Sequence, residues 1–146
     1  MSSKYIPVSI KRLVEKRANS YCEYCYATAN FSPSYFEFDH VMPSSVGGAT
    51  TAENLALSCG KCNNRKSNLM EYIDPFTNEL VKLFHPRKDL WTDHFTWSED
   101  STIVIGLTPS GRATTLLLQI NRPSNVNLRR LLAKEGWHPP NSYPLD

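Results

Sequence analysis

The chain has 146 residues, of which 40% are hydrophobic and 21% are charged, and its formal net charge is +2. This composition is typical of a globular domain rather than a disordered chain, and so small a net charge does not by itself indicate a nucleic-acid partner. No apolar run approaches the roughly 18 residues that a membrane span needs. The start of the chain lacks the continuous apolar stretch of a secretory signal, so we expect an intracellular protein with no membrane partner.

The first half of the chain holds two predicted helices and one short strand. Apolar residues recur at the i, i+3, i+4 spacing over Val8 to Ala18, which predicts an amphipathic helix. Apolar and polar residues alternate at Phe36 to Phe38, which predicts a strand. Pro43 to Thr51 is rich in Ser and Gly and reads as a loop, and either threonine at its end can cap a short helical turn. Asn63 to Leu69 is the second helix candidate.

The character of the chain changes after Tyr72. The turn at Asp74-Pro75 is the expected seam between a first half, residues 1–73, and a packing extension, residues 74–146. Trp91, Phe95 and Trp97 are expected to pack in the core, because large aromatic side chains dominate small cores. The pattern of this extension predicts a hairpin and two helices, with strands at Phe95 to Trp97 and Thr102 to Leu107 and helices at Gly111 to Ile120 and Val126 to Lys134.

Four cysteines form two pairs, Cys22-x-x-Cys25 and Cys59-x-x-Cys62. This spacing lets both thiolates of one turn reach the same tetrahedral ion, and two such turns complete a closed zinc site. Disulfides or four inert buried cysteines are the alternatives, but a reducing intracellular setting favours the metal. A zinc ion with four thiolates has no open position, so we expect a structural ion that fastens the two ends of the segment between the pairs.

The candidate catalytic and metal-binding residues lie inside or beside that segment. His40 is suited to be a general base, because imidazole titrates near neutral pH, and the adjacent Asp39 offers the hard oxygen that Mg²⁺ prefers. Asn54 can hydrogen-bond near the imidazole or brace the loop, and Asn63 can offer an amide oxygen to a metal ion. Each residue alone has a simpler explanation as a surface or turn residue. Neighbours on a strand point to opposite faces, so the strand must end or twist at Asp39-His40 for both to serve one site.

Taken together, these residues follow a known order. The motifs C-x-x-C, F-x-F-D-H-V-x-P-x-x-x-G-G, T-x-x-N-L and C-x-x-C-N-x-x-K occur in succession between Tyr21 and Lys66. This order closely resembles the HNH endonucleases, the ββα-metal or His-Me finger family. The resemblance implies an α+β fold, with a ββα-metal core stapled by a four-cysteine zinc site, an N-terminal helix, and a C-terminal hairpin plus helices. The second half resembles the corresponding segment of small stand-alone bacterial or phage members.

The resemblance also implies roles for single residues. Asp39 would bind the catalytic divalent ion, His40 would be the general base, and Asn54 would support the site. Asn63 stands where the family has a third His, a variant that resembles the nuclease domain of RNA-guided CRISPR effectors. An amide oxygen is a hard ligand, so we expect Mg²⁺ or Mn²⁺ beside Asp39 and Asn63.

These roles predict a metal-dependent endonuclease that hydrolyses phosphodiester bonds of DNA, with RNA as the other candidate substrate. The products would carry 5′ phosphate and 3′ hydroxyl, and the location would be the cytoplasm of a bacterial or phage-infected cell. The alternative function is a zinc-stabilised nucleic-acid-binding module without turnover. Binding alone would need neither the Asp-His pair nor Asn63.

Several basic residues are candidates for phosphate contacts. Lys66 and Arg65 follow the second cysteine pair, although a solvated helix face explains these two equally well. Lys61 lies within the pair and is a weaker candidate. His85 and His94 are candidates for extra metal or phosphate ligands. The region of the last predicted helix is basic and can track a DNA backbone or simply face solvent; its arginines are Arg122, Arg129 and Arg130.

Overall fold

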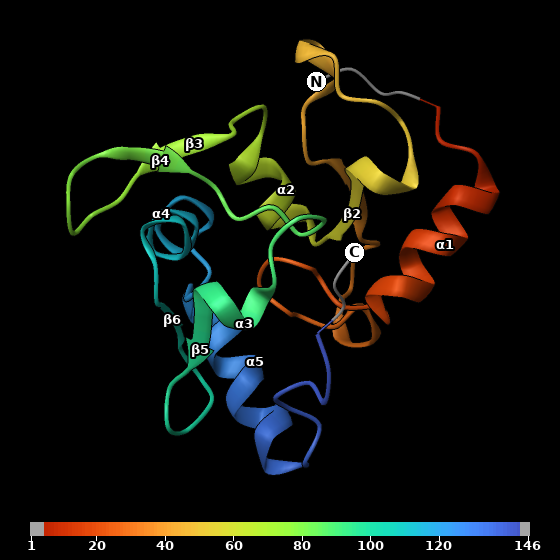
Figure 1. Ribbon diagram of the computed structural model, residues 1–146. Helices are drawn as coiled ribbons and strands as arrows, with labels where there is room; N and C mark the ends of the chain where they lie inside the picture. Colours follow the sequence, from red (N-terminus) through yellow and green to blue (C-terminus); the bar gives the residue numbers. More distant parts are fainter. Residues whose placement is uncertain (1–4, 144–146) are drawn as a thin grey trace.

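The computed structural model describes residues 5–143, which form five α-helices and three small antiparallel sheets (Figure 1). The helices are α1 (Val8–Ala18), α2 (Gly60–Lys66), α3 (Trp91–His94), α4 (Pro109–Leu118) and α5 (Pro123–Lys134). The strand pairs are β1 (Glu37–His40) with β2 (Leu55–Ser58), β3 (Glu71–Ile73) with β4 (Leu80–Lys82), and β5 (Phe95–Trp97) with β6 (Val104–Gly106). Single 3₁₀ turns cover Ala29–Phe31, Ser44–Val46 and Ala52–Asn54. This is the predicted α+β class.

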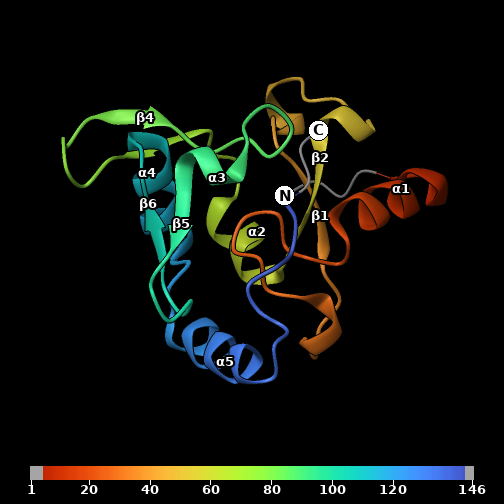
Figure 2. The same ribbon diagram turned by 60° about the horizontal axis from the view of Figure 1, so that its bottom comes forward.

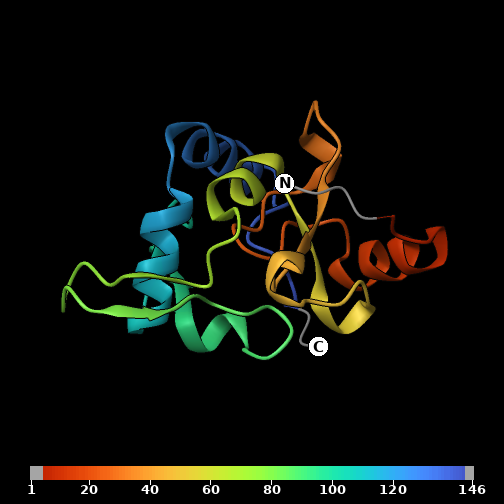
Figure 3. The same ribbon diagram turned by 90° about the horizontal axis from the view of Figure 1, so that it is seen from above.

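The hairpin β1–β2 and the helix α2 form one unit at the centre of the molecule. The register places Glu37 opposite Ser58 and His40 opposite Leu55, and α2 begins two residues after β2 ends. Figures 2 and 3 show β2 between α1 on one side and α2 on the other. All four residues of β2 are buried, as expected for a strand that is covered on both faces.

The second helix begins three residues earlier than predicted. Cys59 caps α2, because its Sγ accepts a hydrogen bond from the Cys62 backbone N–H at 3.4 Å. The second cysteine pair is therefore wound into the first turn of the helix, and the predicted start at Asn63 is corrected to Gly60. The helix ends at Lys66 because Ser67 has a φ of +51°, which is outside the right-handed helical region.

The two C-terminal helices also begin earlier than their apolar pattern indicates. The Thr108 hydroxyl accepts from the Gly111 N–H at 3.0 Å and caps α4, with Pro109 in the first turn. Pro123 takes the same place in α5. Proline suits the first turn because its missing N–H would have no partner there.

One hydrophobic cluster includes side chains from both expected halves, among them Tyr24, Cys62, Trp91 and Leu117. The turn at Asp74-Pro75 connects β3 to β4, and buried Asp74 is 2.9 Å from the Arg112 guanidinium on α4. The division at residue 73 stays a prediction, and residues 1–4 and 144–146 of the two halves lie outside the described part of the chain. No helix between residues 5 and 143 is long and apolar enough to cross a membrane.

Candidate active site

The four cysteines lie together as the sequence predicts. Their Sγ atoms are all within 4.8 Å of one another and all four side chains are buried. The Cys25 and Cys59 sulfurs are 3.8 Å apart, and a tetrahedral centre with zinc–sulfur bonds of about 2.3 Å has sulfur–sulfur edges of about 3.8 Å. The cysteines are not joined by disulfides. The cluster therefore fits a closed thiolate metal site.

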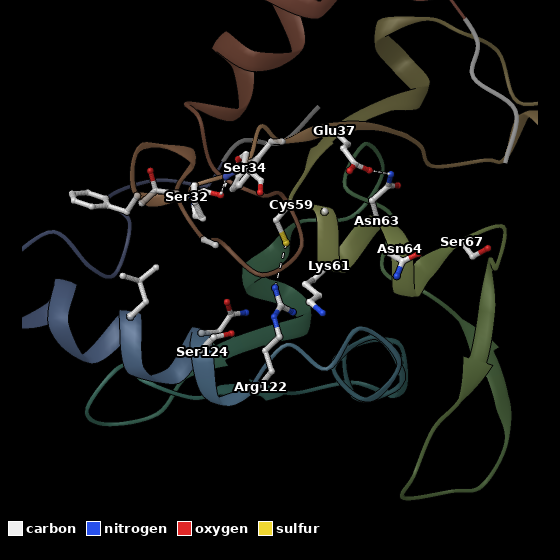
Figure 4. Close-up of a pocket in the computed structure, with 18 residues that line it drawn as sticks. Ser32, Ser34, Glu37, Cys59, Lys61, Asn63, Asn64, Ser67, Arg122 and Ser124 are labelled. Carbon is white, nitrogen blue, oxygen red and sulfur yellow. Dashed lines mark hydrogen bonds between the residues drawn. The ribbon is translucent and has the colours of Figure 1, made fainter.

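Two arginines of the predicted basic region, Arg122 and Arg129, contact this cluster or the backbone around it. Arg122 donates from Nη2 to the Cys59 Sγ at 3.4 Å (Figure 4). Burial acts to lower the pKa of Arg122, but the negative charges of the cysteines outweigh it and raise the pKa. Arg129 is buried and donates to the Cys25 carbonyl at 3.4 Å and to the Ile120 carbonyl at 2.9 Å. Of the three arginines, Arg130 alone is exposed.

Asp39 points from β1 towards α2 and is buried. Its Oδ2 accepts a hydrogen bond from the Tyr24 hydroxyl at 2.6 Å and lies 3.3 Å from the Lys66 Nζ. The same ammonium donates to the Val41 carbonyl at 3.1 Å. Burial raises the pKa of Tyr24, and the charge of Asp39 raises it further, so the hydroxyl stays protonated and remains a donor. Because side chains two positions apart on a strand share a face, Asp39 and Glu37 both leave β1 on the side that lies against α2.

Lys66 is buried, unlike the exposed lysine that a phosphate contact was expected to use. Its side chain is 2% exposed and its ammonium is paired with Asp39. In this position the ammonium neutralises the charge of the Asp39 carboxylate. Arg65 is exposed, and its Nε donates to the Leu117 carbonyl at 2.8 Å, so it fastens α2 to α4. Lys61 is exposed on the first turn of α2.

Asn63 faces β1 across the gap between strand and helix. Its Nδ2 donates to the Glu37 Oε1 at 2.5 Å (Figure 4). Glu37 was not among the predicted site residues. The signal for it is the two-residue period of a strand, because a side chain two positions before Asp39 leaves β1 on the same face. Oxygen donors from Glu37, Asp39 and Asn63 thus line facing surfaces of β1 and α2, and such a hard donor set suits Mg²⁺ or Mn²⁺.

His40 is the last residue of β1, so the strand ends directly after the Asp-His pair. Its Nε2 lies 3.0 Å from the Thr50 Oγ1. Thr50 was expected only as a helix cap, but the structure uses its hydroxyl as a partner of the imidazole. No sequence signal distinguishes this role of Thr50 from a cap, because the two residues are ten positions apart.

Asn54 braces the loop between β1 and the 3₁₀ turn that precedes β2. Its Oδ1 accepts from the Met42 N–H at 2.9 Å, and its Nδ2 donates to the carbonyls of Met42 at 3.0 Å and Ala49 at 2.9 Å. Gly48 lies against this braced backbone, where an added Cβ would be 1.7 Å from the Met42 carbonyl oxygen. Gly47 has a φ of +94°. Glycine is therefore required at position 47 for a left-handed turn and at position 48 for a close approach of two backbone segments.

A cavity of about 770 Å³ opens between β1, α2 and the start of α5. Glu37, Lys61, Asn63 and Arg122 line it (Figure 4). The cavity thus brings a carboxylate, an amide and an exposed ammonium to one face next to the cysteine cluster.

The two candidate histidines of the second half line a different cavity, of about 750 Å³, together with Lys66. His85 Nδ1 accepts from the Arg87 N–H at 3.2 Å, and burial lowers the pKa of His85. His94 Nδ1 lies 2.6 Å from the Thr108 Oγ1. Trp91 and Phe95 lie in the core with stacked rings, as predicted, whereas Trp97 is half-buried and packs against the core from its edge.

Comparison with known proteins agrees with this geometry. Residues 22–69 match the model of the HNH endonuclease family. A stretch of 54 residues is 43% identical to the CRISPR-associated endonuclease Cas9 of Corynebacterium diphtheriae. That stretch is 36% of this chain but 5% of the relative, so the chain corresponds to a small part of that protein's length. The resemblance predicted from the motif order is confirmed for this segment.

Proposed function

Because residues 22–69 are a segment of the HNH endonuclease family, we propose that this protein is a metal-dependent nuclease that hydrolyses phosphodiester bonds of DNA. The observation that carries the proposal is the set of oxygen donors on β1 and α2, with a histidine at the end of the same strand. A module that only binds nucleic acid would have no need of this arrangement.

His40 is the general base of the proposed reaction and accepts a proton from the attacking water. Thr50 holds one nitrogen of the ring at 3.0 Å, which limits the orientations of the imidazole. Asn54 fixes the backbone of the loop between these two residues through its three hydrogen bonds to Met42 and Ala49. Such positioning supports proton transfer because a base must lie within hydrogen-bond reach of the proton that it removes.

Two metal sites follow from the two donor sets. Cys22, Cys25, Cys59 and Cys62 would hold a structural Zn²⁺. Asp39 and Asn63, with Glu37 as an additional oxygen donor, would hold a catalytic Mg²⁺ or Mn²⁺. When bound there, the divalent ion supplies positive charge to the phosphate and to the departing oxygen.

Lys61 is the phosphate contact that the geometry favours. It is exposed and lines the same cavity as Glu37 and Asn63, whereas Lys66 is buried against Asp39. A flexible lysine on the rim of the site can neutralise a phosphate without reading the base sequence.

Plasmid nicking tests the proposal directly. Supercoiled DNA is incubated with the zinc-loaded protein in Mg²⁺ or Mn²⁺, and the His40→Ala variant is the matched control. We expect nicked or linear product from the wild type and little from the variant. No cleavage of DNA in either ion, with DNA retained in a gel shift, would instead support the non-catalytic binding module. Equal cleavage by wild type and variant would remove His40 as the base, and a parallel incubation with RNA establishes the substrate class.

A further inference from the structure

Tyr24 connects the first cysteine pair to the candidate catalytic carboxylate. It lies between Cys22 and Cys25 in the chain, is fully buried, and places its hydroxyl 2.6 Å from the Asp39 Oδ2. Its backbone is held on both sides, because the neighbouring Glu23 N–H donates to the Leu57 carbonyl at 2.9 Å and the Trp91 indole donates to the Tyr24 carbonyl at 3.1 Å. These hydrogen bonds fix the backbone that positions the Tyr24 hydroxyl beside Asp39.

Both contacts of the Asp39 carboxylate fall on the same oxygen. The Tyr24 hydroxyl and the Lys66 ammonium each lie beside Oδ2, and Oδ1 takes part in neither contact. A carboxylate is planar, so holding Oδ2 also fixes the direction in which Oδ1 points. Ligands of a metal ion are oriented by hydrogen bonds of this kind, and their loss usually weakens metal binding.

We infer that Tyr24 is a positioning residue for the catalytic metal: its hydroxyl holds Oδ2 and thereby directs Oδ1 of Asp39 towards the divalent ion. The inference rests on the proposed function, because it concerns the same ion. It goes beyond that function by making the cysteine cluster a determinant of the affinity for the catalytic ion. The cluster holds the turn on which Tyr24 lies, so the two metal sites are linked through one side chain.

The substitution Tyr24→Phe isolates this role. The ring of Tyr24 packs edge-on against Phe84, with centroids 6.4 Å apart, and phenylalanine keeps that packing while it removes only the hydroxyl. Tyr26→Phe is the matched control. Tyr26 is a buried tyrosine next to the same cysteine pair, and its ring packs against Trp91 and Tyr143.

The measurement is Mn²⁺ binding to the zinc-loaded protein without nucleic acid, followed by the electron paramagnetic resonance signal of the free ion. We expect Tyr24→Phe to weaken Mn²⁺ binding by roughly 10-fold to 100-fold, with one zinc per chain retained and with an unchanged thermal transition. Tyr26→Phe should bind Mn²⁺ like the wild type. Equal Mn²⁺ affinity of wild type and Tyr24→Phe would overturn the inference, as would a wild type that binds no Mn²⁺.

A double-mutant cycle separates positioning from a general loss of structure. In the Asp39→Ala background, Tyr24→Phe should change Mn²⁺ affinity no further, because the group through which Tyr24 acts is absent. An equal additional loss in that background would assign Tyr24 a structural role and overturn the inference. Failure of the proposed function gives a different result, in which the wild type binds Mn²⁺ in the Tyr24-dependent manner but cleaves neither DNA nor RNA.

Discussion

Asn63 on α2 donates its side-chain amide to Glu37 on β1, and the two polar atoms are 2.5 Å apart. This contact closes the gap between helix and strand beside the second cysteine pair. It turns the Asn63 nitrogen towards the carboxylate, which leaves the amide oxygen to face another partner. The Glu37 carboxylate therefore orients the Asn63 amide, whose oxygen is the proposed metal ligand.

Replacing the charge of Glu37 tests whether this carboxylate contributes to the catalytic ion. Glu37→Gln keeps an oxygen that can accept from Asn63 but removes the negative charge. We expect the Mn²⁺ concentration for half-maximal plasmid cleavage to rise, with most of the cleavage rate restored at saturating Mn²⁺, because ion binding weakens with fewer charged ligands.

Glu71→Gln is the control for that measurement, since Glu71 is an exposed glutamate on β3. It should leave the Mn²⁺ dependence of cleavage unchanged. A Glu37→Gln variant with the wild-type Mn²⁺ dependence would limit Glu37 to its hydrogen bond with Asn63.

The contact between His40 and Thr50 predicts a second phenotype. Thr50→Val preserves the branched shape but removes the hydroxyl that lies 3.0 Å from the imidazole. We expect the cleavage rate at saturating Mn²⁺ to fall by less than the roughly 10²-fold to 10⁴-fold that a general base contributes, while Mn²⁺ affinity stays the same. Single-turnover cleavage at several Mn²⁺ concentrations measures both quantities.

Thr51→Val is the neighbouring control. Thr51 is exposed, and its side chain makes no capping hydrogen bond to the following turn. It should cleave at the wild-type rate. Equal rates for Thr50→Val and Thr51→Val would show that the imidazole does not depend on this hydroxyl.

The sequence predicts the features of the fold and site that depend on local spacing, and it does not predict the contacts that depend on distant partners. The helix at Val8–Ala18 and the gathering of the four cysteines follow from periodicity and spacing, which are local properties. Lys66 and Arg129 were expected at the surface because charged side chains are seldom buried without a partner. Asp39, the partner of Lys66, is 27 residues away, and Cys25, whose carbonyl accepts from Arg129, is 104 residues away. Spacing alone does not reveal such pairs.

The ion pair-like contact between Arg122 and Cys59 predicts that the second half of the chain stabilises the cysteine metal site. Arg122→Met keeps much of the side-chain length but removes the positive charge beside the sulfur, which is 3.4 Å away. Four thiolates around Zn²⁺ carry a net charge of about −2, so removal of a neighbouring cation should weaken zinc binding. We expect faster zinc transfer to a colorimetric chelator, measured at neutral pH.

Arg130→Met removes the same charge from an exposed position on α5 and should release zinc at the wild-type rate. Arg122→Lys retains a charge but loses the planar donor, so it should give an intermediate rate. If Arg122→Met and Arg130→Met released zinc equally slowly, Arg122 would serve only to close the end of α4, where it also donates to the Gln119 carbonyl.

Gly48 allows the loop between β1 and β2 to close, because its Cα lies against the backbone that Asn54 braces. In Gly48→Ala the new Cβ would meet the Met42 carbonyl oxygen at 1.7 Å and the Asn54 Nδ2 at 2.9 Å, so the loop must move and the contact between Thr50 and His40 must loosen. Overpacking of this kind costs about 1–3 kcal/mol. We expect a lower melting temperature and a reduced cleavage rate, with zinc content unchanged because the cysteines lie on other segments. Gly60→Ala is the matched control, since its Cβ would be 3.5 Å from the Glu37 Oε2, an ordinary contact. If both variants melted and cleaved alike, the close approach at Gly48 would not constrain the loop.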